Sequence, residues 1–185
     1  MARLTAFFIC SLDLRVTDAS GRFDWAEPPE DVHAFANDRE RRIGTHLYGR
    51  RMWETMRAWE TAPDDGTVQG DYGVHWRASD KVVYSSTLER VDTERTRIER
   101  HFDPAAVRAL KAAAVAPVHV GGADLAGQAF RAGLVDRLEV LLVPVVVGAG
   151  QRALPDGFGG RLTLVEERTF PAGWVHIAYA VGGDV

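Results

Sequence analysis

Two adjacent glycines, Gly121 and Gly122, stand between the apolar run Pro117–Val120 and the helix-like segment Leu125–Ala132. Glycine has no Cβ, so the backbone at such a turn can approach a ligand closely. The free N–H groups at the start of the following helix favour an anion such as a phosphate. The pattern predicts a strand that ends at a phosphate-binding turn, although a turn that only needs flexible backbone has the same sequence.

A second segment of this kind, Thr45–Met56, contains a short apolar strand, Gly49, two arginines and the start of a helix that runs to about Glu60. A guanidinium group donates paired hydrogen bonds that match phosphate oxygens. Two anion-binding helix starts indicate a phosphorylated cofactor. In the alternative interpretation, Arg50 and Arg51 only solvate the helix start, where their charge opposes the helix dipole at a small cost.

A third segment, Lys81–Thr87, is a β-branched run that ends in three hydroxyl side chains, Ser85, Ser86 and Thr87. Open α/β sheets bind ligands at the carboxyl ends of their strands. Hydroxyl groups in that place can bond a ribose or its phosphate. The same residues also end many strands simply because they form turns.

In this order, the motifs Leu-Tyr-Gly-Arg-Arg-x-Trp-Glu, Val-Val-Tyr-Ser-Ser and Val-Gly-Gly-Ala-x-Leu, followed by Gly133–Asp136, Pro144 and Gly148-x-Gly150, resemble the dihydrofolate reductase-like superfamily. The nearest branch is the C-terminal reductase domain of bifunctional riboflavin biosynthesis proteins. The resemblance implies a single α/β domain over residues 1–185. Its three layers would be a mixed, mostly parallel central sheet with flanking helices, and the sheet would end in an antiparallel C-terminal hairpin. The implied cofactor is NADPH.

The resemblance also assigns the three segments to parts of NADPH. The arginine segment would meet the phosphates, the hydroxyls would lie beside the adenosine 2′-phosphate, and the glycine pair would touch the pyrophosphate and the nicotinamide side. In dihydrofolate reductases the glycine pair is joined by a cis peptide bond. The implied cofactor-binding residues are Gly49, Arg50, Arg51, Ser85, Ser86, Thr87, Gly121, Gly122, Ala123, Asp124 and Leu125.

Two positions depart from the family pattern. Met52 stands where dihydrofolate reductases usually have a threonine whose hydroxyl supports the cofactor. The segment Ser11-Leu12-Asp13-Leu14 lacks the glycine that often ends the family motif Ser-x-Asp-Gly. We therefore expect the loop that covers the nicotinamide to take another path, and we retain Asp13 as a candidate catalytic residue.

Reduction of a C=N or C=O bond by hydride also needs a proton, which a buried carboxylic acid or an ordered water can supply. In the family, an acidic residue that can serve as this acid lies on the helix before the Gly-Arg segment. The nearest residues in this sequence are Asp31 and His33. Asp31 is the second catalytic candidate, but it can equally satisfy free N–H groups at a helix start. Trp25 and His33 are candidates for the substrate pocket. Trp25 can equally cover the core, and His33 can lie on the surface.

The composition fits one globular domain, with 185 residues of which 46% are hydrophobic and 26% charged. A net charge of −4 argues against a general nucleic-acid binder. The single cysteine, Cys10, is expected to be a buried thiol, and the six histidines show no metal-ligand spacing, so we expect no metal site. The apolar run Leu4–Leu12 is too short to span a membrane and lacks the flanks of a signal peptide, which indicates a cytoplasmic protein.

The first half of the chain alternates strand and helix signals. Leu4–Leu12 is apolar on both faces, as in a central buried strand. A helix is expected over Pro29–Ile43. Thr61–Asp80 is interpreted as a surface excursion with one helical turn around Trp76, and Glu89–Arg100 as a solvated edge or loop.

The second half begins with a helix at Asp103-Pro104, where a capping side chain precedes a proline. Leu138–Val147 reads as a long strand, in which Pro144 implies a bulge or an edge. Arg161–Thr169 and Trp174–Val181 are predicted to form a hairpin. The glycine-rich segment that follows Leu138–Val147, residues 148–153, is predicted to be a loop near the site.

These features predict an NADPH-dependent reductase of a small heterocyclic substrate, with a pyrimidine carrying a ribosyl group as first choice and a pterin as second. The reaction would be most like that of 5-amino-6-(5-phosphoribosylamino)uracil reductase or dihydrofolate reductase. The chain begins at the first reductase strand, without a deaminase segment before it, which favours a reaction outside riboflavin synthesis. A homodimer is expected. The alternative is a non-catalytic, dimeric nucleotide-binding protein that keeps the fold.

Overall fold

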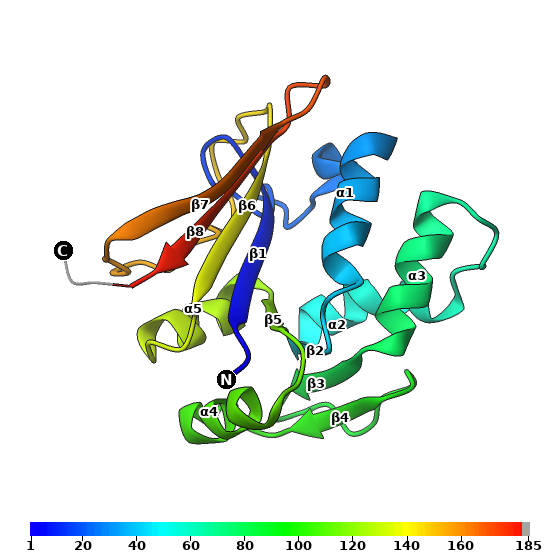
Figure 1. Ribbon diagram of the computed structural model, residues 1–185, viewed down its shortest axis with the longest axis vertical. Helices are drawn as coiled ribbons and strands as arrows, with labels where there is room; N and C mark the ends of the chain where they lie inside the picture. The colour runs from blue at the N-terminus through cyan, green and yellow to red at the C-terminus, as the bar shows by residue number, and fades with distance from the viewer. Residues whose placement is uncertain (183–185) are drawn as a thin grey trace.

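The computed structural model describes residues 1–182, which form one eight-stranded sheet in the order β4-β3-β2-β5-β1-β6-β8-β7 (Figure 1). The strands are β1 (Leu4–Ser11), β2 (Thr45–Gly49), β3 (Asp80–Tyr84), β4 (Thr96–Glu99), β5 (Val118–Gly121), β6 (Arg137–Val143), β7 (Leu162–Thr169) and β8 (Val175–Val181). The helices are α1 (Glu30–Glu40), α2 (Arg50–Met56), α3 (Val68–Ala78), α4 (Pro104–Ala113) and α5 (Ala123–Arg131), with short 3-10 helices η1 (Asp24–Ala26) and η2 (Arg57–Thr61). The predicted α/β fold is confirmed. The six strands β4-β3-β2-β5-β1-β6 are parallel, and only β8 runs antiparallel to both of its neighbours.

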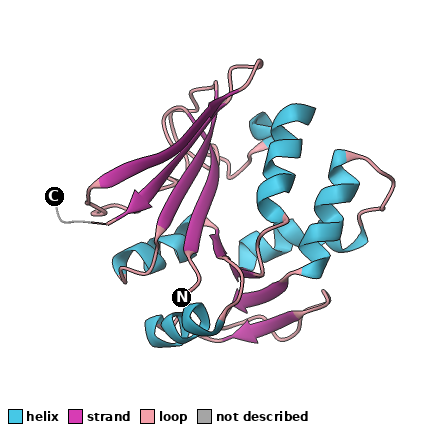
Figure 2. Ribbon diagram, in the orientation of Figure 1, coloured by secondary structure: helices cyan, strands magenta, loops and turns pink. Residues whose placement is uncertain are grey.

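Alternate side chains of β1 face two different helical layers. Leu4 and Phe8 are buried in the core that α4 and α5 complete. Phe7 and Ile9 pack on the other side, against a cluster that includes Phe35 of α1. Figure 2 shows the resulting arrangement, with helices on both sides of the sheet. A strand that is apolar on both faces therefore becomes the middle of a three-layer fold.

The parallel strands bring their carboxyl ends to one edge of the sheet. Tyr48 of β2 pairs with Gly121 of β5, and Gly49 pairs with Tyr84 of β3. β1 lies on the other side of β5, and β6 lies beyond β1. The loops that follow β3, β2, β5, β1 and β6 therefore emerge at this edge in that order.

The predicted C-terminal hairpin is confirmed. β7 pairs antiparallel with β8, and its turn is closed by the Phe170 N–H donating to the Trp174 carbonyl at 2.9 Å. β6 ends at Val143, before the predicted limit of Val147, because Pro144 has no N–H to donate to the ladder. β7 forms the outer edge of the sheet.

The interpretation of Thr61–Asp80 as a surface excursion is wrong, because eleven of its residues form helix α3. The hydroxyl of Thr67 caps this helix by accepting from the Gly70 N–H at 3.1 Å, and Trp76 is fully buried. A Cβ on Gly70 would lie only 2.5 Å from the Pro63 carbonyl oxygen. Glycine is needed there for close packing, and its low helix propensity hides the helix from sequence analysis.

Other local predictions agree with the structure. The Asp103 side chain accepts from the Ala105 N–H at 2.9 Å and starts α4 as expected. Cys10 is buried, and burial raises the pKa of its thiol to about 12, with a smaller contribution from Asp13. β4 is a short exposed edge strand within Glu89–Arg100. Within residues 1–182, no helix combines the length and apolar character needed to cross a bilayer.

Candidate functional site

Two helix starts lie side by side at the carboxyl edge of the sheet. Because Tyr48 and Gly121 are paired, the residues that follow them, Gly49 and Gly122, are neighbours where α2 and α5 begin. Neither residue provides a side-chain cap. The first-turn N–H groups of α5 are therefore available to an anion from outside the chain.

The glycine pair is packed tightly against the second segment. A Cβ on Gly121 would lie 2.8 Å from the Tyr48 ring, and a Cβ on Gly122 would lie 3.3 Å from the Met52 Cβ. Gly122 also has a φ of +89°, which other residues rarely adopt. The peptide bonds of the described residues are trans, that between the two glycines included, in contrast to dihydrofolate reductases. These positions accept only glycine without rearrangement.

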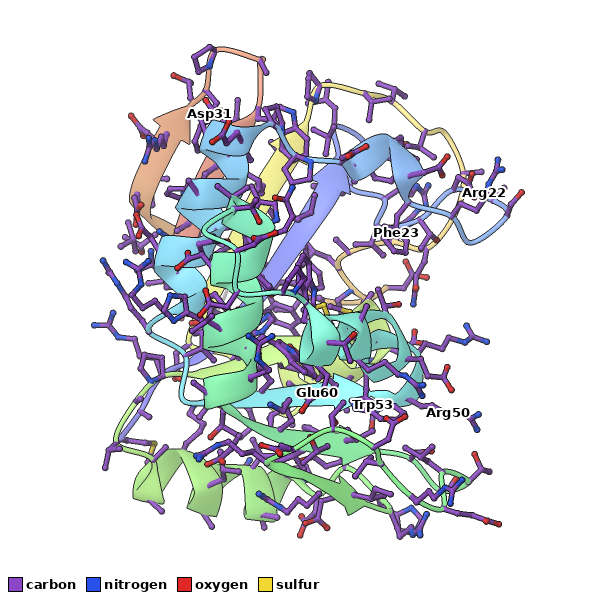
Figure 3. The ribbon with its side chains drawn as sticks, turned by 90° about the vertical axis from the view of Figure 1, so that its right-hand side faces the viewer. Arg22, Phe23, Asp31, Arg50, Trp53 and Glu60 are labelled. Carbon is purple, nitrogen blue, oxygen red and sulfur yellow. The ribbon has the colours of Figure 1, made fainter. Side chains whose placement is uncertain are left out.

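Arg50 connects the second and third segments. Its Nη1 donates to the Thr87 hydroxyl at 3.3 Å, and its Nε donates to the Glu54 carboxylate at 2.7 Å. The guanidinium is half-exposed, and Figure 3 shows Arg50 at the outer surface beyond Trp53. Arg51, also exposed, lies in the same helical turn. The predicted phosphate-binding arginines thus stand next to the predicted ribose-binding hydroxyls.

The three hydroxyl residues after β3 differ in their availability. The Ser85 hydroxyl accepts from the Leu88 N–H at 3.0 Å and so holds the turn. Ser86 and Thr87 are exposed. The turn interpretation therefore describes Ser85, whereas Ser86 and Thr87 present donors and acceptors to solvent beside Arg50.

A groove of about 560 Å³ continues from the start of α5 along its outer side. The Asp124 carboxylate accepts from Gln151 Nε2 at 2.8 Å, which ties α5 to the loop after β6. Leu125 is buried in the core, so only its backbone can reach the site. The groove is lined by Arg15, Ala123, Asp124, Gly127, Gln128, Arg131, Gly150, Gln151, Arg152, Leu154, Pro155 and Asp156.

Residues 2–176 match the family of the RibD C-terminal domain. The chain belongs to this family. A relative, the uncharacterized protein YyaP of Bacillus subtilis (strain 168), is 26% identical over 176 residues, which cover 94% of this chain and 92% of YyaP. The family match, over residues 2–176, includes all the segments described above.

Solved structures share the fold at low sequence identity. A candidate riboflavin biosynthesis protein from Shewanella sp. PV-4 superposes with a TM-score of 0.78 at 15% identity, covering 98% of this chain and 99% of that one. A pyrimidine reductase-like protein from Corynebacterium diphtheriae gives 0.71 at 16% identity, covering 99% and 93%. The Thermotoga maritima diaminohydroxyphosphoribosylaminopyrimidine deaminase/5-amino-6-(5-phosphoribosylamino)uracil reductase gives 0.69 at 12% identity, covering 98% of this chain and 57% of the larger protein.

In this RibD C-terminal domain, Asp13 joins two loops at the carboxyl edge. Its carboxylate accepts from the N–H groups of Val147 (3.0 Å) and Gly148 (2.9 Å), and from the Ser11 hydroxyl (2.7 Å). These bonds, that from Val147 foremost, lower the pKa of Asp13 to about 2. An acid of this strength is ionised at neutral pH, so the arrangement suits loop positioning and does not suit proton donation.

Asp31 and His33 lie on α1, away from the glycine pair. Asp31 is exposed in the first turn and accepts from the Val32 N–H at 2.9 Å, and Figure 3 shows it remote from Arg50. His33 is buried instead of lying on the surface. Its Nδ1 is 3.0 Å from Asn37 Oδ1, and its ring meets Tyr72 edge-on with ring centroids 5.9 Å apart. His33 therefore packs α1 against α3.

Trp25 is half-buried and packs beside β1 with the cluster around Phe35, so it covers the core. Its Nε1 is buried and has no hydrogen-bond partner among the described residues. Sequence analysis missed the exposed apolar side chains at the same edge, although isolated leucines and a phenylalanine in an acidic loop were a signal. They are Leu12, Leu14, Phe23 and Val146.

Proposed function

We propose that this protein is an NADPH-dependent reductase that transfers hydride to a small heterocyclic substrate. The observation that carries the proposal is the convergence of three predicted segments, far apart in sequence, at the carboxyl edge of one sheet. Gly49 lies beside Gly122, and Arg50 bonds Thr87. Membership of the RibD C-terminal domain family supports the same activity class.

The residues present fit NADPH. The bare backbone of Gly121 and Gly122, where a Cβ would collide with Tyr48 or Met52, and the uncapped start of α5 suit a pyrophosphate. Arg50, Arg51, Ser86 and Thr87 suit the adenosine 2′-phosphate side. When bound, NADPH would supply the hydride, and the protein would position the acceptor and exclude water.

For the proton, we propose Asp31 acting through water. Its carboxylate is exposed at the start of α1, on the segment that follows β1, and so it can exchange protons with solvent. Asp13 is less suited, because its carboxylate is occupied by bonds from the Val147 and Gly148 N–H groups of the loop after β6. Trp25 lies on the same segment, and its half-buried ring can form an aromatic wall of the substrate pocket.

The second candidate is a dimeric nucleotide-binding protein without catalysis. One observation favours it: Met52, which lies against Gly122, offers no hydroxyl to a cofactor. A homodimer is part of both proposals. Leu164 and Val165 of the edge strand β7 are about half exposed, and an edge strand can pair with a second copy. Sedimentation equilibrium would measure the mass in solution.

Titration of the purified protein with NADPH and with NADH tests the proposal. Tighter binding of NADPH supports the cofactor assignment, and no binding of either nucleotide contradicts it. NADPH oxidation with dihydropteridines and aminouracil ribosides then separates the enzyme from the binding protein. Cofactor binding without turnover across this panel would favour the non-catalytic candidate.

A further inference from the structure

The order of strands fixes where a hydride acceptor lies relative to the anion-binding groups. The arginines and hydroxyls follow β2 and β3, and the glycine pair follows β5. A nucleotide whose phosphates lie over these strand ends has its reactive end toward the next strands in the sheet, which are β1 and β6. The acceptor must therefore contact the loops after β1 and β6, and this placement rests on the proposed function.

These loops present apolar side chains to solvent. Leu12 is 62% exposed, Leu14 36%, Phe23 50% and Val146 66%. The Leu12 N–H donates to the Val145 carbonyl at 2.8 Å, which holds the loops after β1 and β6 side by side. Exposed apolar side chains beside a binding site favour a ligand that covers them, because covering removes apolar surface from water.

The charge of the same region is negative. Residues 12–31, from the end of β1 into the first turn of α1, carry six acidic and two basic side chains. Both arginines are already paired, Arg15 with Asp13 and Arg22 with Asp18. Within residues 1–182, no ion pair neutralises the four remaining carboxylates, which belong to Asp24, Glu27, Glu30 and Asp31.

Lysines do not supply a phosphate-binding group for the acceptor. The chain has two, and both are buried. Lys81 Nζ donates to the carbonyls of Trp76 and Ser79, both at 3.0 Å. Lys111 Nζ is paired with the Asp136 carboxylate at 2.7 Å. Neither ammonium group is available to a ligand.

The arginines nearest to the two loops are also engaged. Arg152 pairs with Asp156 at 3.1 Å. Arg168 lies on β7, the third strand from β1, and its guanidinium is stacked 5.1 Å from the Phe35 ring centroid and 4.8 Å from that of Phe170. Arg50 and Arg51 follow β2, where the nucleotide is proposed to bind. The remaining arginine after β6, Arg161, stands just before β7 at the opposite end of the sheet, because Thr163 of β7 and Arg137 of β6 both pair with Ala180. Among the described residues, the loops at the carboxyl ends of β1 and β6 therefore carry no unpaired cationic side chain.

We propose that the hydride acceptor is a planar heterocycle without a phosphate group or net negative charge, held against Leu12, Leu14 and Phe23. A phosphate dianion there would approach the segment that carries the four unpaired carboxylates, with no cation on the two loops to offset the repulsion. A neutral ring would instead cover the apolar side chains. The phosphorylated substrate named for the Thermotoga maritima protein is thus excluded for this chain.

A matched pair of ligands tests this inference: 5-amino-6-(ribosylamino)uracil and its 5′-phosphate. Their dissociation constants would be measured calorimetrically on the full chain saturated with NADP⁺, at low and at physiological ionic strength. We expect the riboside to bind about tenfold or more tightly than the phosphate at low salt, and the difference to shrink as salt screens the charges. Equal or tighter binding of the phosphate, or binding of neither compound, would overturn the inference.

Charge variants sharpen the test. The double change Asp24→Lys with Glu27→Lys should bring the two affinities together, whereas Glu167→Lys, on the exposed outer strand β7, should leave their ratio unchanged. An unchanged ratio in the double variant would show that this loop does not face the acceptor. Failure of NADP⁺ itself to bind is a separate result, which contradicts the proposed function and is seen before either uracil compound is added.

Discussion

Met52, in the first turn of α2, lies against Gly122, the residue before α5: a Cβ on Gly122 would be 3.3 Å from the Met52 Cβ. This contact joins two helix starts that are 70 residues apart in the chain. Beside this contact, Gly121 and Gly122 present backbone without side chains. The proposed pyrophosphate site therefore depends on how closely these two residues approach.

Gly122→Ala should weaken both the fold and NADPH binding. The backbone conformation of Gly122, with φ at +89°, is one that alanine rarely adopts, and forcing it costs about 1–3 kcal/mol. We expect a lower midpoint in urea and NADPH affinity reduced about tenfold or more. Gly159→Ala is the control, because its Cβ would meet nothing within 4 Å and its φ is not positive. Unaltered NADPH binding by Gly122→Ala would show that this backbone does not face the cofactor.

Arg50→Ala should weaken NADPH much more than NADH. The guanidinium bonds Thr87 on the side where the 2′-phosphate is proposed, and a charge-assisted bond to a phosphate at a half-exposed site contributes about 1–2 kcal/mol. Fluorescence titration with both nucleotides measures the ratio of affinities. Arg161→Ala, at an exposed arginine before β7, should change neither. Equal losses for the two nucleotides would place Arg50 at a phosphate that both share.

The location of the site was predictable, because it depends on the ends of parallel strands. Gly49, Ser85 and Gly121 each follow an apolar run, and pairing of these runs in one sheet brings their ends together. The register between β2 and β5 was not predictable, nor was the contact of Met52 with Gly122. Both arise from packing between residues distant in sequence.

Two local features were not predicted from the sequence, because one depends on an unusual backbone conformation and the other on close backbone packing. Leu14 has a φ of +57°, so the turn after β1 keeps a left-handed residue although the family glycine is missing. Bonds from the Leu14 N–H to the Ser11 carbonyl and from the Ala153 N–H to the Leu14 carbonyl stabilise a conformation that costs about 1–2 kcal/mol for a residue with a Cβ. Helix α3 was missed because its glycines serve close packing.

Asp13→Asn should loosen the loop after β6 without removing an acid from the reaction. The carboxylate accepts two backbone N–H groups, and an amide group can accept only with its single oxygen. We expect amide exchange at Val147 and Gly148 to accelerate about tenfold, measured by hydrogen exchange. Asp38→Asn, on exposed α1 surface, is the control. Loss of turnover with unchanged exchange at both amides would instead identify Asp13 as a participant in proton transfer.

A buried histidine pair should make stability depend on pH. His46 and His119 lie on paired positions of β2 and β5, with their Nδ1 atoms 3.0 Å apart. Burial, with a smaller contribution from the neighbouring His46, lowers the pKa of His119 to about 4, against the opposite effects of Glu40 and Glu139. His119 is therefore neutral in the folded protein at neutral pH.

The sign of the effect follows from proton uptake. Between pH 6.5 and about 4, His119 takes up a proton in the unfolded chain but not in the folded one, so the free energy of unfolding falls as the pH falls. The two pKa values differ enough for this contribution to reach about 3 kcal/mol. Urea unfolding at a series of pH values measures it.

His119→Gln should flatten the profile between pH 6.5 and 4, whereas His101→Gln, at an exposed position, should preserve it. A wild-type slope in the His119→Gln variant would assign the pH dependence to carboxylates such as Glu139, whose pKa is lowered to about 2 because bonds to His176 and Arg39 outweigh the effect of burial.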